Sequence, residues 1–173
     1  YNDWGYLLDN ENSLFNYINK YLFEKYPEIK GTIFLPIESQ MHIPQNKGYY
    51  IKNKSVESPE FLEFLSRISD KFDLAFHGVK HTYEDSKTNK IIHECCNLYN
   101  SEILDLVSRV EEFQSKTGLQ FKGGKFPGYK YNERAKKIIN AINAKWWALD
   151  VDMINKIKSK NELNIDPELK ITI

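Results

Sequence analysis

Two histidines stand four residues apart in the segment 76–82, which reads FHGVKHT and follows a short apolar run. This spacing places His77 and His81 one turn apart if the segment coils, so that both imidazoles reach one metal ion. Asp3, close to the start of the chain, offers a third ligand. One aspartate and two histidines leave positions for water and substrate, which is typical of a catalytic zinc site. The alternative is that the two histidines are polar residues of a loop.

Helical and strand patterns alternate along the chain. Apolar periodicity and caps predict helices at 11–26, 59–68 and 98–116, another after Asn132, and a short one at 153–160. Runs of β-forming residues predict strands at 31–35, 73–76, 120–123, 145–149 and 171–173. Residues 36–57 are expected to form a long loop, and 83–97 a mixed polar stretch. Such alternation predicts parallel strands joined by helical crossovers.

The residues able to do chemistry fall just past the ends of the predicted strands. They are Asp3 (if a strand precedes Tyr1), His77, Lys125, Asp150 and Asp152. In a β/α barrel the carboxyl ends of the strands form one rim, where the active site is built. We therefore expect these side chains to meet in space.

Composition limits the function classes. A chain of 173 residues is one domain of ordinary size, and its 24 acidic and 24 basic residues balance. With no basic stripe, a nucleic-acid binder is not indicated, and no apolar run approaches the length of a membrane span. The two cysteines, Cys95 and Cys96, are neighbours, which excludes a disulfide scaffold. They follow His93, but the spacing lacks the gap usual in metal clusters, so a structural role is favoured.

Both ends of the chain indicate that it is a piece of a longer polypeptide. It begins at Tyr1 inside an apparent motif, without an initiator methionine, and ends in a strand-like run at 170–173. Targeting segments and the compartment are therefore left open, and so is the oligomeric state.

Four motifs, taken in order, resemble those of the polysaccharide deacetylase domain of the NodB homology type, carbohydrate esterase family 4. An Asp-Asp pair after the first strand reads here as Asn2-Asp3, and His-Ser/Thr-x-x-His is matched by 77–82. The motif Arg-x-Pro, followed by a small or aromatic residue, reads KFPGY at 125–129, and Trp-x-x-Asp reads WALD at 147–150. A fifth motif, Leu-x-His, would lie beyond Ile173. The resemblance covers nearly the whole chain.

This resemblance implies a distorted (β/α) barrel with fewer than eight strands, spanning 1–173 as a single catalytic domain. It implies a divalent metal, most often zinc, held by Asp3, His77 and His81; cobalt and nickel suit the same ligands. The implied activity is removal of N-acetyl or O-acetyl groups from amino sugars in a polysaccharide or glycolipid precursor. A metal so held polarises the amide carbonyl and activates water, and the N–H of Gly128 is expected to bind the oxyanion.

Two departures from the family pattern concern the base. Asn2 stands where the family has its aspartate base, and an amide has no useful basicity. Lys125 stands where the family has an arginine paired with that aspartate, so both members of the pair differ together. In the family, the residue matching Asp150 orients the catalytic histidine. Asp152 is either a substitute base or the N-cap of a helix that begins at Met153.

Aromatic residues near the motifs are candidates for stacking on sugar rings. Trp4 and Tyr129 are two of them, although core or surface packing is the alternative for each. Trp146 and Trp147 are adjacent on a strand and face opposite ways, so we expect one in the core and the other at the site, with Trp147 as the candidate for substrate binding. His93 is expected on the surface or at a helix start. Two other functions stay open: a catalytically silent sugar-binding domain, and a metal hydrolase for a cyclic imide or small amide.

Overall fold

The computed structural model describes residues 14–38, 40–42, 50–52, 59–150 and 170–172. The chain divides into two compact units. Unit 1 comprises Tyr1–Ile33 and Val56–Asp73, and unit 2 comprises Phe34–Ser55 and Leu74–Ile173. No helix within the described ranges is both long enough and apolar enough to cross a membrane. Cys95 and Cys96 are free thiols, as their adjacency predicted.

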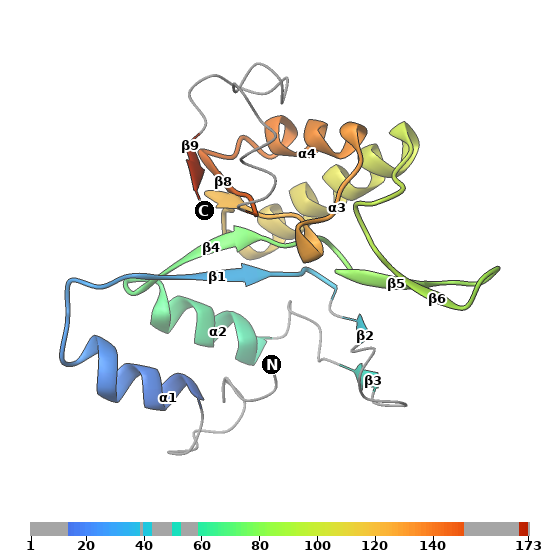
Figure 1. Cartoon of the computed structure of the whole chain (residues 1–173). Coiled ribbons are helices and arrows are strands. Elements are labelled where there is room, and N and C mark those ends of the chain that lie inside the picture. The colour runs from blue at the N-terminus through green and yellow to red at the C-terminus, as the bar shows by residue number, and fades with distance from the viewer. Residues whose placement is uncertain (1–13, 39, 43–49, 53–58, 151–169, 173) are drawn as a thin grey trace. The chain divides into compact units, whose positions relative to one another are not determined.

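Five strands form the main sheet in the order β1-β4-β7-β8-β9 (Figure 1). They are β1 (Gly31–Leu35), β4 (Phe72–Phe76), β7 (Gly123–Gly124), β8 (Trp146–Ala148) and β9 (Lys170–Thr172). The pairs β4–β7, β7–β8 and β8–β9 are parallel. The predicted mixed α/β class with a parallel sheet is thus confirmed. Closure of this sheet into a barrel stays a prediction.

Strand β7 lies at 123–124 instead of the predicted 120–123. It consists of two glycines because large neighbours leave no room for side chains. A Cβ on Gly124 would lie 2.7 Å from the carbonyl oxygen of Phe76 and 2.8 Å from the Trp147 ring, and the Trp146 ring lies against Gly123. Glycine has low β propensity, so a strand made of it leaves little signal in the sequence.

In unit 1, the described part of the helix predicted at 11–26 is irregular and ends at Phe23 instead of residue 26. It consists of α1 (Leu14–Ile18) and a π-helical turn, η2 (Asn19–Phe23). A π turn changes which residues face inward, so Phe23 is buried edge-on against Phe72, with ring centroids 5.0 Å apart. Tyr21 and Tyr26 are exposed. Helix α2 (Pro59–Ile68) is confirmed.

Two helices of unit 2 match the sequence patterns closely. Helix α3 (Asn100–Thr117) ends at Gly118, whose φ of 72° is the left-handed conformation that favours glycine. Helix α4 (Lys136–Ala141) follows a 3₁₀ turn, η4 (Glu133–Ala135), and lies beside α3 (Figure 1). The core of these two helices contains Ile103, Leu106, Val110, Phe113, Ile138 and Ile139.

Two hairpins occupy stretches for which a loop and a mixed polar segment were predicted, and both predictions were wrong. Strands β2 (Gln40–His42) and β3 (Tyr50–Lys52) pair antiparallel, and so do β5 (Thr82–Asp85) and β6 (Lys90–His93). The β5–β6 turn is built on Asp85, whose carboxylate accepts bonds from the amide of Lys87 and the hydroxyl of Thr88. Strands of three or four residues are too short to show the apolar alternation that would have revealed them.

Candidate functional site

His77 is the first residue after β4, and its neighbour across the sheet fixes its ring. The register pairs Phe76 with Gly124, so that Lys125 follows β7 at the same level as His77. The Nδ1 atom of His77 lies 3.2 Å from the carbonyl oxygen of Lys125. A carbonyl only accepts, so Nδ1 carries the proton and Nε2 keeps a lone pair. Metal-binding histidines usually have such a bond, because it orients the ring and selects the tautomer.

The segment that carries His77 and His81 forms a turn and is not helical, so the two histidines are not spaced by a helical turn. Gly78 and His81 both have positive φ, 87° and 67°. The turn nevertheless brings the rings together, with centroids 4.8 Å apart and planes inclined by 68°. The Nδ1 atom of His81 is buried and has no hydrogen-bond partner among the described residues. The two imidazole rings are therefore close neighbours, and a nitrogen atom of one of them has no partner among the described residues.

Burial keeps both imidazoles neutral. It lowers the pKa of His77 from 6.5 to about 4, against the opposing effect of the hydrogen bond with Lys125. It also lowers the pKa of His81 from 6.5 to about 4, and nearby His93 and Lys125 add to the shift. The neutral imidazole is the form that binds a metal ion.

Lys125 places its ammonium group between two aromatic faces. The Nζ atom lies 4.5 Å from the ring centroid of Phe34 and 4.9 Å from that of Tyr129. Both distances are typical of cation–π contacts. Lys125 therefore lies beside His77, in the loop at 125–129 that carries the third motif (the third-motif loop). The ring of Tyr129 lies over the ammonium group of Lys125.

His93 is the residue of this site that sequence reasoning missed. It was expected on the surface or at a helix start; it is partly exposed and ends β6, paired with Thr82, so the helix start was wrong. Its ring centroid is 5.8 Å from that of His81, and its Nδ1 atom is buried without a hydrogen-bond partner in the described part of the chain. A turn-forming run at 85–89 between β-forming residues was the signal that could have revealed the hairpin.

Gly128 packs directly against His93. Its φ is 58°, and a Cβ atom at this position would collide with the imidazole ring of His93. The third-motif loop and the β5–β6 hairpin are therefore fitted closely together beside His81. The expected oxyanion role of the Gly128 N–H stays a prediction.

Two predicted site residues belong to β8 or follow it: Trp147 lies within the strand and Asp150 comes two residues after its end. Asp150 is exposed. Trp147 is 1% exposed and packs on Phe76 and Phe126, with centroids 6.0 and 4.9 Å away. Trp147 is thus the core member of the tryptophan pair and not a wall of a sugar site. Trp146 is the partly exposed member and lies edge-on to Phe34.

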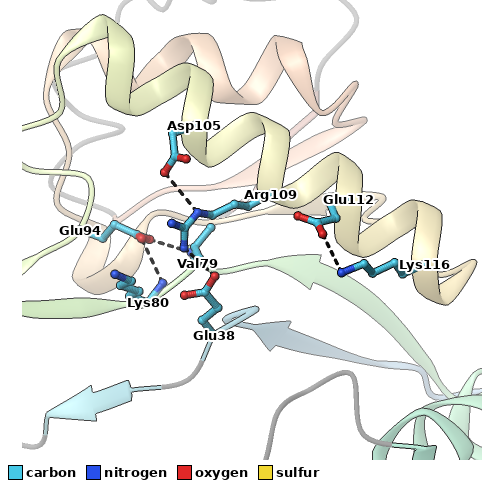
Figure 2. A network of polar contacts seen from close by, with 8 residues as sticks. All are labelled: Glu38, Val79, Lys80, Glu94, Asp105, Arg109, Glu112 and Lys116. Carbon is cyan, nitrogen blue, oxygen red and sulfur yellow. Dashed lines mark hydrogen bonds and ion pairs between the residues drawn. The ribbon is translucent and has the colours of Figure 1, made fainter.

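Beside the turn at 78–81 lies a cavity of about 260 Å³, lined by residues that include Val79, Lys80 and Glu94. Arg109 of α3 also lines it and binds Glu38 at 2.6 Å and Asp105 at 3.2 Å (Figure 2). The guanidinium charge is therefore shared by these two carboxylates.

The metal ligand set is only partly described. Asn2, Asp3, Trp4 and Asp152 lie outside the described residues. Within those residues, no group of three or more His, Cys, Asp and Glu side chains is arranged to hold a metal ion. The two imidazoles still fit a metal, because each is partly buried and neutral, Nδ1 of His81 has no partner among the described residues, and the bond from Nδ1 of His77 leaves its Nε2 with a lone pair. No protein-family model, curated protein or solved structure matches this chain.

Proposed function

We propose that this chain is a metal-dependent hydrolase that removes N-acetyl or O-acetyl groups from amino sugars of a polysaccharide or glycolipid precursor. The observation that supports it most is the state of His77, whose Nδ1 donates to the Lys125 carbonyl and whose ring lies 4.8 Å from that of His81. Two neutral imidazoles with this orientation suit a single divalent cation. The order of the four motifs adds support of a different kind.

His77, His81 and Asp3 would hold the metal, with zinc as the first choice and cobalt or nickel as alternatives. When bound there, such an ion polarises an amide carbonyl and lowers the pKa of a water ligand toward neutrality. The protein's part is to keep both imidazoles neutral, as their partial burial does.

The other residues of the site have roles that follow from their chemistry. The N–H of Gly128 donates to the oxyanion of the tetrahedral intermediate, and the ring of Tyr129, which is partly exposed, borders the sugar. Asp150 orients the catalytic acid. Lys125 supplies positive charge beside His77, where the family has arginine. Asp152 takes the proton of the attacking water, because Asn2 has no basicity.

Loss of the base supports a second candidate, a catalytically silent sugar-binding domain with the same fold. The ammonium group of Lys125 is held by the rings of Phe34 and Tyr129, which is compatible with a site that no longer needs a charge pair with a catalytic carboxylate.

Acetate release from N-acetylated chito-oligosaccharides tests the proposal and separates the two candidates. Zinc-loaded protein is expected to release acetate, and a chelator or the His81→Ala substitution is expected to abolish release. The Asp152→Ala variant is expected to lose at least tenfold in turnover, as for loss of a general base. Zinc binding and oligosaccharide binding without acetate release would favour the silent domain. Unchanged turnover in Asp152→Ala would remove Asp152 as the base.

A further inference from the structure

Glu94 is a buried carboxylate directed at the backbone of the histidine turn. It follows β6 and is 9% exposed. Its Oε2 atom accepts a hydrogen bond from the amide of Val79 at 2.7 Å, and Oε1 accepts one from the amide of Lys80 at 3.0 Å. Its own amide donates to the carbonyl oxygen of His81 at 3.1 Å. Figure 2 shows the carboxylate lying against this turn. Glu94 thus binds three consecutive residues, 79–81, of the segment that carries the two imidazoles.

Gly78 is shaped to receive this carboxylate. A Cβ atom at position 78 would lie 2.5 Å from Oε2 of Glu94 and 2.8 Å from Pro127, and φ is 87°. The serine or threonine of the family motif would not fit beside Glu94. The glycine at position 78 therefore leaves the space that the carboxylate of Glu94 occupies.

His81 needs such an arrangement because its backbone is strained. Its φ of 67° lies in the left-handed region, where a residue with a side chain persists only when its surroundings hold it. The far side of the turn is held by amides of 37 and 38, which donate to the carbonyls of Gly78 and Val79 at 3.2 and 2.6 Å. Glu94 supplies the bonds on the near side.

The charge of Glu94 is directed to these amides and not to the neighbouring guanidinium. Arg109 binds Glu38 and Asp105, and both described contacts of the Glu94 carboxylate are backbone N–H groups (Figure 2). A carboxylate with two amide donors is a strong and geometrically specific clamp. Burying a carboxylate costs free energy, which an exposed glutamate would not incur. This cost favours the view that Glu94 is buried because it holds the turn.

We infer that Glu94 is the positioning residue of the metal site, holding the turn at 78–81 so that His77 and His81 face one cation. This inference rests on the proposed function, because it assigns the purpose of the clamp to metal binding. Ligand-orienting groups of this kind typically change metal affinity by about 10–100-fold when removed.

The test compares Glu94→Gln with wild type, using Glu112→Gln as a matched control. A glutamine amide has one acceptor oxygen, so it satisfies only one of the two N–H donors and turns an NH₂ group toward the other. Glu112 lies on the exposed surface of α3, paired with Lys116, and does not touch the turn. Two readouts are used: hydrogen exchange of the amides of Val79 and Lys80 in metal-free protein, and affinity for Zn²⁺ with the visible spectrum of bound Co²⁺.

Glu94→Gln is expected to speed exchange at Val79 and Lys80 at least tenfold, to weaken Zn²⁺ binding at least tenfold and to change the Co²⁺ spectrum. The control should match wild type in each. If Glu94→Gln does not fold, Glu94→Asp keeps the charge but is too short to reach both amides, and the same losses are expected. If a folded Glu94 variant binds zinc as tightly as wild type does, the positioning role of Glu94 is overturned and the proposed function is not. Absence of zinc binding by wild type would overturn the proposed function and, with it, the metal role of Glu94.

Discussion

His77 and His81 are held in the neutral form, which makes the folded protein sensitive to acid. An imidazole that is buried in the folded state but exposed in the unfolded chain resists protonation only while folded. The folded pKa of each is about 4, and the unfolded value is 6.5. Below pH 6.5 the unfolded chain therefore binds protons that the folded chain does not bind, and the free energy of unfolding falls as the pH falls.

We predict that metal-free protein loses stability between pH 6.5 and pH 4, with each histidine contributing at most about 1.4 kcal/mol per pH unit. Urea unfolding at a series of pH values in a chelating buffer measures this. Burial raises the pKa of Glu94 and acts in the opposite direction, so the comparison is with a His77→Asn/His81→Asn double variant. If wild type and the double variant show the same pH dependence of stability, the loss of stability in acid cannot be assigned to His77 and His81.

Gly78 and Gly118 allow backbone strain to be separated from steric crowding. Both have positive φ, but a Cβ on Gly118 would meet nothing within 4 Å, whereas one on Gly78 would meet Glu94 and Pro127. Gly118→Ala is expected to cost about 1–2 kcal/mol, the price of a left-handed alanine. Gly78→Ala is expected to cost at least about 1 kcal/mol more, because of overpacking. Equal urea midpoints for the two variants would show that Glu94 does not crowd the turn.

At the scale of elements, the junction between the β5–β6 hairpin and α4 is tied by Asn132. Its Oδ1 atom caps η4 by accepting from the amide of Ala135 at 3.0 Å, and its Nδ2 donates to the carbonyl of Leu98 at 2.8 Å. Its backbone amide donates to the carbonyl of Cys95 at 2.9 Å. This residue connects the segment after His93 to the loop that follows Gly128.

Asn132→Ala is predicted to destabilise the protein by about 2–3 kcal/mol, the sum of a lost N-cap and an unsatisfied carbonyl. Asn100→Ala on the exposed start of α3 is the control, with an expected change within about 0.5 kcal/mol. Thermal and urea unfolding measure both variants. A decrease of less than about 1 kcal/mol in the free energy of unfolding of Asn132→Ala would mean that the hydrogen bonds of this side chain contribute little to stability.

Elements with strong local signals were predictable, and those fixed by their neighbours were not. Helix α2 begins at Pro59, and α3 has a clear apolar face and a terminal Gly118, so both were found with nearly correct bounds. Strand β7 was displaced because two glycines carry no strand signal. The β5–β6 hairpin was missed because each strand has only four residues, too few for a clear apolar alternation, and the position of His93 was missed with it.

At the scale of the whole molecule, the parallel sheet explains why distant residues meet. The register of β4 with β7 places His77 and Lys125 at neighbouring carboxyl ends, which is what alternating strands and helices predicted. The bond between the His77 ring and the Lys125 carbonyl was beyond sequence reasoning, because it depends on register. Trp147 illustrates the same limit, since only packing shows which of two adjacent tryptophans enters the core.

The central claim is that His77 and His81 bind one divalent cation together. Zinc stoichiometry and affinity, measured by metal analysis and competition titration on wild type, His77→Ala and His81→Ala, test it most directly. We predict one tightly bound zinc per wild-type chain and a loss of at least tenfold in affinity for each variant, with folding retained. Equal zinc binding by wild type and both folded variants, or none by wild type, would contradict the claim.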